Sequence, residues 1–305
     1  MLTVASLSRN ELNKRLAGVG LVVRTGPFVS RIHSPIAQIA DGIALLYGDY
    51  PLVDENGFAD FHVNMRRSAG LRRWYKPQVR FDLDGHEPFE PLPEAHAFPM
   101  LEWALNWCIS TRAHSWLTVH AAVVERNGLA AILPAPPGSG KSTLCAALVN
   151  RGWRLLSDEL AMFRLADARL VPVPRPVSLK NRSIEVIRNY VPDAVFSVPV
   201  GNTTKGTVAH LKAPSESIAR ADETAQPAWI VFPKYESGAA TSLVPIPHAR
   251  AFFRVAENAF NYSHMGAAGF QTLTAVIDGC ASYDFRYSNI DEAIALFAAL
   301  ERPRQ

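Results

Sequence analysis

Residues 127–150 read NGLAAILPAPPGSGKSTLCAALVN, and this stretch decides the fold of the region around it. The apolar run at 129–134 predicts a strand, and the run at 142–150 predicts a helix. Between them, residues 135–142 fit the phosphate-loop pattern G-x-x-x-x-G-K-[ST], with Ala135 in place of the first glycine. Strand, glycine-rich loop and helix in this order are the context in which such a loop binds a nucleotide.

The loop is expected to bind the phosphates of ATP. Its glycines allow successive backbone N–H groups to curl around a phosphate, Lys141 neutralises the phosphate charge, and the hydroxyl of Ser142 binds Mg²⁺. A solvated glycine- and serine-rich loop is the alternative. The residues expected to bind the nucleotide are Ala135, Pro136, Pro137, Gly138, Ser139, Gly140, Lys141, Ser142 and Thr143.

An acidic pair follows one helix after the loop. Asp158 and Glu159 interrupt the apolar run at 153–165, which predicts a strand. Asp158 is expected to bind Mg²⁺ through its water shell, and Glu159 to accept a proton from a nucleophile; a solvated turn is the alternative. The two acids lie 17 and 18 residues after Lys141, a short spacing that favours a compact kinase-type site.

His120 is a candidate for the same site. Asn127-Gly128 joins two apolar strands and predicts a hairpin. The hairpin would place His120, which lies 21 residues before Lys141, near the end of the strand that leads into the loop. A packed core histidine is the alternative.

Lysine is scarce in this chain, with seven lysines against 24 arginines, yet four of the seven lie at 141–212. Lys180 ends an extended, proline-interrupted segment, and Lys205, His210 and Lys212 follow in a segment rich in glycine and threonine. A lysine is a compact point charge that suits phosphate, so Lys180 is expected to bind the nucleotide. Lysines in solvated loops are the alternative.

The chain of 305 residues divides unequally. Short β-like runs alternate with turns before residue 90, the proline-rich segment 85–99 indicates a linker, and residues 100–114 predict a helix. We expect a smaller, mainly β or α+β domain at 1–95 and a larger domain at 96–305. In the larger domain, 228–235 predicts a strand, and 248–260 and 289–301 predict helices. The β-like runs lie at 20–26, 29–34, 43–49, 59–68 and 78–85.

Composition excludes several classes of protein. Apolar residues make up 48% and charged residues 19%, which is ordinary for a folded globular chain. The net charge of +3 is too small to indicate a nucleic-acid partner. No run is long and apolar enough for a membrane span, the N-terminus lacks the features of a signal peptide, and three widely spaced cysteines suggest reduced thiols. A cytoplasmic location is expected.

Together these motifs resemble the catalytic core of the HPr kinase/phosphorylase family, and the chain as a whole is similar to bacterial HPr-kinase-related proteins. The resemblance covers residues 117–165, where His120, the loop and the segment RGWRLLSDE have the spacing of the family motif. It implies an α/β fold: a P-loop kinase domain of the HPr kinase/phosphoenolpyruvate carboxykinase type, with a smaller N-terminal α+β domain.

The resemblance implies Mg²⁺-dependent transfer of the γ-phosphoryl group of ATP to a hydroxyl, with Glu159 as base, Lys141 stabilising the phosphoryl group and His120 in the active site. It also suggests a homo-oligomer. Glu159 stands where the family has Asp, and Glu185 is not a secure match for the family's metal-binding Glu, so HPr as substrate and the reverse reaction are not carried over. The alternatives are a nucleotide-gated binding or assembly module, and transfer to a carboxylate or enol acid.

Overall fold

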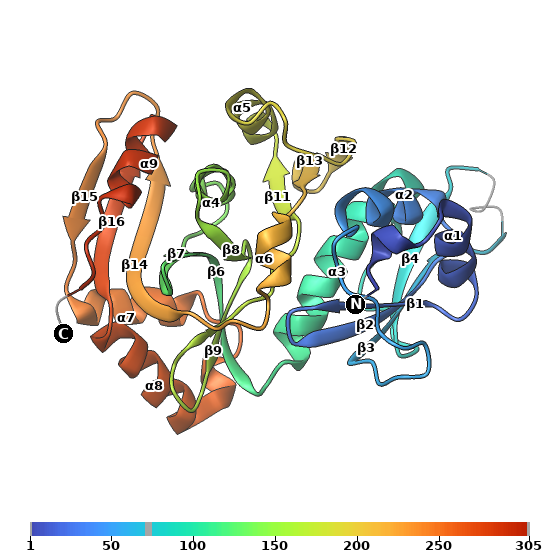
Figure 1. Ribbon diagram of the computed structural model, residues 1–305, viewed down its shortest axis with the longest axis horizontal. Coiled ribbons are helices and arrows are strands. Elements are labelled where there is room, and N and C mark those ends of the chain that lie inside the picture. Colours follow the sequence, from blue (N-terminus) through green and yellow to red (C-terminus); the bar gives the residue numbers. More distant parts are fainter. Residues whose placement is uncertain (1, 71–74, 304–305) are drawn as a thin grey trace.

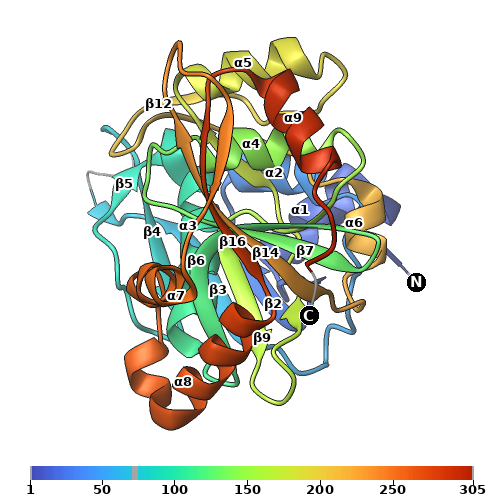
Figure 2. The same cartoon turned by 90° about the vertical axis from the view of Figure 1, so that its left-hand side faces the viewer.

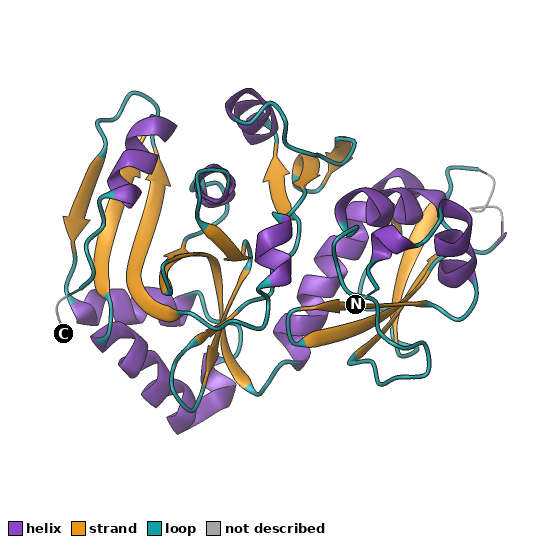
Figure 3. Ribbon diagram, viewed as in Figure 1, coloured by secondary structure: helices purple, strands orange, loops and turns teal. Residues whose placement is uncertain are grey.

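A computed structural model describes residues 2–70 and 75–303. These residues have a mixed α/β fold with three β-sheets (Figures 1 and 3). The first sheet belongs to the N-terminal part, and the second is the large sheet that carries the glycine-rich loop. The third is small; its strands fall within the sequence range of the second sheet, and it lies between the other two in Figure 1. None of the helices in the two described ranges is long and apolar enough to cross a membrane.

The N-terminal sheet has five strands in the order β1-β2-β3-β4-β5. Strands β2 and β3 are parallel, and the other neighbours are antiparallel. Three α-helices pack together beside it (Figure 1). The elements are β1 Leu21–Thr25, β2 Phe28–His33, β3 Phe61–Arg67, β4 Gln78–Leu83, β5 Leu92–Pro93, α1 Arg9–Ala17, α2 Ala37–Leu46 and α3 Ala97–Arg112, with short 3-10 helices at Val4–Ser6 and Glu94–His96.

One strand expected in this region is wrong, because residues 43–49 form the end of α2 and the turn after it. The buried side chains of Ile39, Ile43 and Leu46 recur at helical spacing, and this longer period outweighs the β-like composition of the short run. The helix expected at 100–114 is confirmed, but it begins at Ala97. Pro99 fits there because the first turn of a helix needs no intrahelical N–H partner.

The central sheet has the order β10-β9-β6-β7-β14-β16-β15, with β8 also paired to β6. Strands β7, β14 and β16 are parallel, and β6 runs antiparallel to β7. The strands are β6 Trp116–Arg126, β7 Leu129–Pro134, β8 Arg154–Ser157, β9 Leu160–Arg164, β10 Leu170–Val171, β14 Gln226–Tyr235, β15 Ser242–Pro245 and β16 Ala281–Tyr287.

Helices cover both faces of the central sheet (Figure 2). The core residues of α4 (Lys141–Val149) and α9 (Ile290–Ala298) belong to one apolar cluster, and those of α7 (His248–Glu257) and α8 (Tyr262–Asp278) belong to another. The expected hairpin is confirmed, since Asn127 and Gly128 both have positive φ between β6 and β7. The strand expected at 228–235 and the helices expected at 248–260 and 289–301 are also present.

A third sheet joins the two parts. Its strands β11 (Val177–Lys180), β13 (Gly206–Leu211) and β12 (Val200–Thr203) are antiparallel in the order β11-β13-β12. Helix α5 (Arg182–Tyr190) follows β11, and α6 (Ser215–Ala219) follows β13. The free edge of β11 lies next to the acidic pair, Asp158 and Glu159, that follows β8. This sheet therefore contributes to the site.

The N-terminal and C-terminal parts share buried contacts. One apolar cluster runs from the N-terminal sheet through α3 to α4, and the boundary expected at residue 95 falls just before α3. Polar contacts cross the same region: the Tyr50 hydroxyl donates to the Pro174 carbonyl at 2.9 Å. The three cysteines, Cys108, Cys145 and Cys280, are buried and unpaired, as expected for reduced thiols.

Candidate functional site

The glycine-rich loop turns from β7 into α4. Gly138 and Gly140 have φ of 86° and 87°, which only glycine adopts without strain. Two tyrosines hold the loop by its carbonyl groups: the backbone N–H of Tyr235 donates to Ser139 at 2.8 Å, and the hydroxyl of Tyr287 donates to Gly140 at 3.0 Å. The loop is therefore fixed from the β14 and β16 side.

The first turn of α4 offers backbone donors. The first intrahelical bond runs from the N–H of Leu144 to the Gly140 carbonyl, so the amides of Lys141, Ser142 and Thr143 have no intrahelical acceptor. Such amides, at the positive end of the helix dipole, favour an anion. The backbone geometry at the start of α4 thus suits an anion such as phosphate.

We expect Gly140→Ala to destabilise the protein more than Gly138→Ala. Both positions have positive φ, which costs an L-residue about 1–2 kcal/mol. A Cβ at Gly140 would also lie 2.5 Å from the Tyr287 hydroxyl oxygen and 2.9 Å from Cβ of Tyr235, whereas one at Gly138 meets nothing within 4 Å. The total for Gly140→Ala is about 2–5 kcal/mol, measurable by denaturant unfolding. Equal losses in the two variants would contradict this packing of the loop.

His120 joins the loop lysine to the second acid. Its Nε2 lies 2.9 Å from Nζ of Lys141 and 3.0 Å from Oε2 of Glu159. A single ring nitrogen cannot donate to the carboxylate and accept from an ammonium in the same protonation state. The proton on Nε2 therefore decides which of the two contacts is a hydrogen bond.

The acidic pair lies in a break between two strands. The strand expected at 153–165 is present but divided: β8 and β9 both pair antiparallel with β6, and Asp158 and Glu159 lie in the break between them. The break remains attached to β6 because the N–H of Ala121 donates to the Glu159 carbonyl at 3.3 Å. The register with β6 is the same on both sides of the break, since Val123 pairs with Ser157 and His120 pairs with Leu160. The shift in register lies one step earlier, where Val124 pairs with Leu155 and Leu156 is the extra residue.

The surroundings push the pKa values of the two acids apart. Burial raises the pKa of Asp158, the charge of Glu159 raises it further, and Lys141 offsets only part of the shift. Burial also raises the pKa of Glu159, but the hydrogen bond from His120 and the charges of Lys141, His120 and Lys180 outweigh it and lower the pKa overall. Glu159 is therefore the acid that stays ionised, the state a proton acceptor needs.

Asp158 is fixed by the third sheet. Its Oδ2 accepts a hydrogen bond of 3.1 Å from the N–H of Ser178 on the free edge of β11, while its buried Oδ1 has no partner among the described residues. The hydroxyl of Ser142 is close enough to lower the pKa of this carboxyl group. An unpartnered oxygen on a buried carboxylate beside a hydroxyl is a donor set that suits one edge of a hydrated Mg²⁺ ion.

Residues 2–70 and 75–303 contain no group of three or more His, Cys, Asp or Glu side chains that could hold a metal ion. Side chains alone therefore do not form a metal centre in these residues. Nucleotide-bound Mg²⁺ needs only one or two protein ligands, because phosphates and waters supply the others. Ser142 and Asp158 fit that role. Glu185 lies exposed in the first turn of α5.

Lys180, at the end of β11, also faces the site. Its charge lowers the pKa of Glu159 and contributes to the lowered pKa of Lys141, whose largest cause is burial. Lys205 lies near Lys180, which together with burial lowers its pKa, and its Nζ lies 4.6 Å from the centre of the Trp103 ring. Lys212 differs, because it pairs with Asp49 at 2.8 Å. Three of the four clustered lysines thus surround the acidic pair.

His210 lies in the same region but is buried, with neither ring nitrogen bonded to a described residue, and its ring packs edge-on against Phe98. Burial lowers its pKa to about 4, so the ring is neutral near pH 7. Sequence reasoning missed Ser178, Tyr235 and Tyr287, which position the acid and the loop.

The site therefore combines a fixed glycine-rich loop, a lysine whose ammonium group contacts a histidine ring nitrogen, and two acids whose pKa values are shifted in opposite directions. This arrangement can bind a phosphate chain, stabilise charge on a phosphoryl group and accept a proton. No family model and no curated protein sequence matches the chain, so the comparisons assign it to no family.

Proposed function

We propose that the protein is an ATP-dependent kinase that transfers the γ-phosphoryl group to a hydroxyl of a peptide, a protein or a small molecule. The observation that carries the proposal is the position of His120 Nε2, within 3.0 Å of both Lys141 Nζ and Glu159 Oε2, beside a glycine-rich loop. The motif resemblance to HPr kinases supports the same reaction.

Each residue has a part in this reaction. The amides of the loop and of the first turn of α4 bind the phosphates, and Lys141 stabilises the charge on the transferring group. Mg²⁺ bound with the nucleotide would neutralise the β- and γ-phosphates, held by Ser142 and Asp158. The acceptor oxygen bonds to the γ-phosphorus as the bond to the β–γ bridging oxygen breaks, and Glu159 takes the hydroxyl proton.

Lys180 ends β11 and Lys205 lies in the turn between β12 and β13, and both are close enough to Glu159 for their charges to interact with it. Because neither forms an ion pair with a carboxylate in the described residues, their charge is available to an anionic ligand. We propose that Lys180 binds the γ-phosphate. A lysine at the end of β11 would draw the terminal phosphate toward Glu159, where the acceptor must enter.

The test is to incubate the protein with γ-labelled ATP and a cell lysate, and to trace the label. A labelled peptide, protein or metabolite is the expected result, and Lys141→Met, which keeps the buried volume, should label nothing. Label in inorganic phosphate alone would favour a nucleotide-gated module instead. Transfer by Lys141→Met at the wild-type rate would contradict the site assignment.

A further inference from the structure

A cleft of about 560 Å³ lies against the other side of the glycine-rich loop. Residues 136–139 form one wall, and the ends of β14, β15 and β16 form the rest, with Arg254 of α7. This volume is within the range of small-molecule sites. The cleft also lies near the carboxyl ends of the parallel strands β7, β14 and β16, where open α/β sheets bind ligands.

The order of the strands places the cleft and the residues around Glu159 on opposite sides of β7. His120 and Glu159 come from β6 and the break between β8 and β9, on one side of β7. The cleft lies on the opposite side of β7, over β14 and β16. If the phosphates of a ligand occupy the loop and its terminal phosphoryl group faces Glu159, its other end can reach this cleft on the opposite side of β7.

The cleft contains a preformed flat surface. The guanidinium of Arg254 lies 3.6 Å from the centre of the Phe232 ring, and its Nη1 is paired with Asp284. Arg250 lies 3.5 Å from the other oxygen of Asp284 and fixes that carboxylate further. The Phe232 ring thus covers one face of the planar Arg254 guanidinium, and the ion pair with Asp284 fixes its edge. The opposite face can therefore stack on a planar group.

The polar groups beside this surface suit a nucleoside. Asp284 is 38% exposed and has oxygens that can accept hydrogen bonds from ribose hydroxyls or from an amino group of a base. Val244, which is 53% exposed, lines the same cleft with apolar surface. A flat cationic plane, an exposed carboxylate and an apolar wall are the features that a base with its ribose requires.

We propose that this cleft binds the base and ribose of the nucleotide, with the base stacked on Arg254. The inference rests on the proposed function, since it assumes that the loop binds the phosphates. The cleft then contributes affinity that depends on the nucleoside, and the loop contributes affinity that depends on the phosphates. These two contributions can be separated by experiment.

The test compares the affinities of ADP and of tripolyphosphate, measured by titration calorimetry in the presence of Mg²⁺. Val244→Trp fills the cleft from an exposed position, and Arg254→Ala removes the stacking plane. Each variant is expected to weaken ADP binding by about tenfold or more while changing tripolyphosphate binding by less than about twofold. The pair of variants guards against misfolding of either one.

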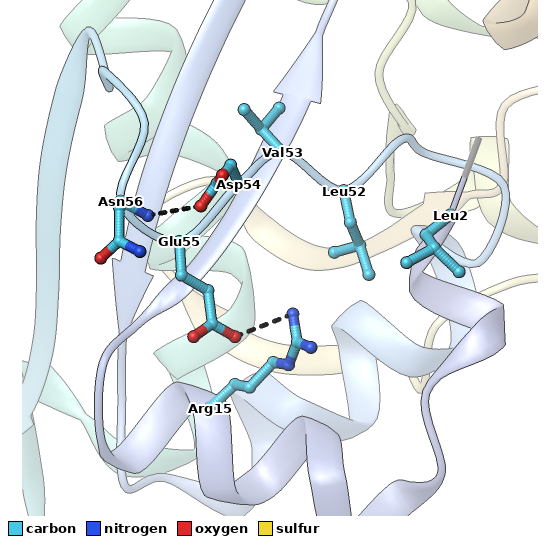
Figure 4. A pocket seen from close by; sticks show the side chains of 7 residues that line it. All are labelled: Leu2, Arg15, Leu52, Val53, Asp54, Glu55 and Asn56. Atoms are coloured by element: carbon cyan, nitrogen blue, oxygen red, sulfur yellow. Dashed lines mark hydrogen bonds and ion pairs between the residues drawn. The ribbon is translucent and has the colours of Figure 1, made fainter.

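A second hollow provides the control. Arg15, Leu52 and residues 54–56 line a hollow of about 390 Å³ in the N-terminal part, where Arg15 pairs with Glu55 at 3.1 Å (Figure 4). Arg15→Ala should leave both affinities unchanged. Unchanged ADP binding in both cleft variants, or equal losses for the two ligands, would overturn the nucleoside site and leave the kinase proposal standing. A wild-type protein that binds neither ligand would overturn both.

Discussion

Replacing Glu159 by Gln is expected to slow phosphoryl transfer by about 10²–10⁴-fold while leaving nucleotide affinity within about twofold. The amide keeps the size of the side chain and can still contact His120 Nε2, which lies 3.0 Å from Oε2. It cannot accept the proton of an attacking hydroxyl. The rate would be measured with γ-labelled ATP and the acceptor that the wild-type protein labels, and the affinity by calorimetry.

The matched control is Glu159→Asp, which keeps the carboxylate but shortens it by one methylene. This variant should retain more activity than Glu159→Gln. The shorter carboxylate can still accept the proton of the attacking hydroxyl after a small movement, whereas the amide of glutamine cannot accept it at all. Equal rates for Glu159→Gln and the wild-type protein would remove Glu159 from the role of base. A loss of affinity as large as the loss of rate would show that Glu159 acts in binding instead.

The parts of the site that lie close in sequence could be predicted from it. Asn127-Gly128 indicates the hairpin, and the loop indicates its own turn into a helix, because both patterns depend on local backbone preference. The hairpin in turn places His120 next to Pro134 and the start of the loop, since Ala121 pairs with Pro134. Local chemistry thus accounts for the contact between His120 and Lys141.

The parts that depend on distant segments could not be predicted. Tyr287 binds the Gly140 carbonyl across 147 residues, and Ser178 reaches Asp158 from the edge of another sheet. Neither residue has a local pattern that distinguishes it from other residues in short strands. The break between β8 and β9 was missed for a related reason: the acids were recognised, but the pairing of both strands with β6 is a tertiary property.

The largest effect on stability is expected at Arg175, which lies between the N-terminal and C-terminal parts. Its Nη2 donates to Glu102 Oε2 at 2.6 Å and to the Glu102 carbonyl at 3.0 Å, and its Nη1 donates to Asn106 at 2.8 Å. The Tyr47 hydroxyl donates to the other oxygen of Glu102 at 2.6 Å. Glu102 and Arg175 are only 2% and 6% exposed, so each charge depends on the other for its stability.

Burial and the neighbouring charge of Glu102 raise the pKa of Tyr47, so its hydroxyl keeps its proton and remains a donor at any ordinary pH. The carboxylate of Glu102 is therefore fully bonded in the folded protein. Removing Arg175 leaves a buried carboxylate with Tyr47 but without a cation, and the cost of an unpaired buried charge greatly exceeds the net stability that the pair itself provides.

We therefore expect Arg175→Met to lower the free energy of unfolding by about 3–5 kcal/mol, and the double variant Glu102→Leu/Arg175→Met to lower it by much less. Urea unfolding followed by circular dichroism measures both. Arg67→Met is the matched control: Arg67 binds Glu94 through two hydrogen bonds of 2.7 and 2.8 Å but is 37% exposed, so its loss should cost at most about 1 kcal/mol. Additive losses in the double variant would contradict the argument, because they would mean that the two charges act independently, not as a pair.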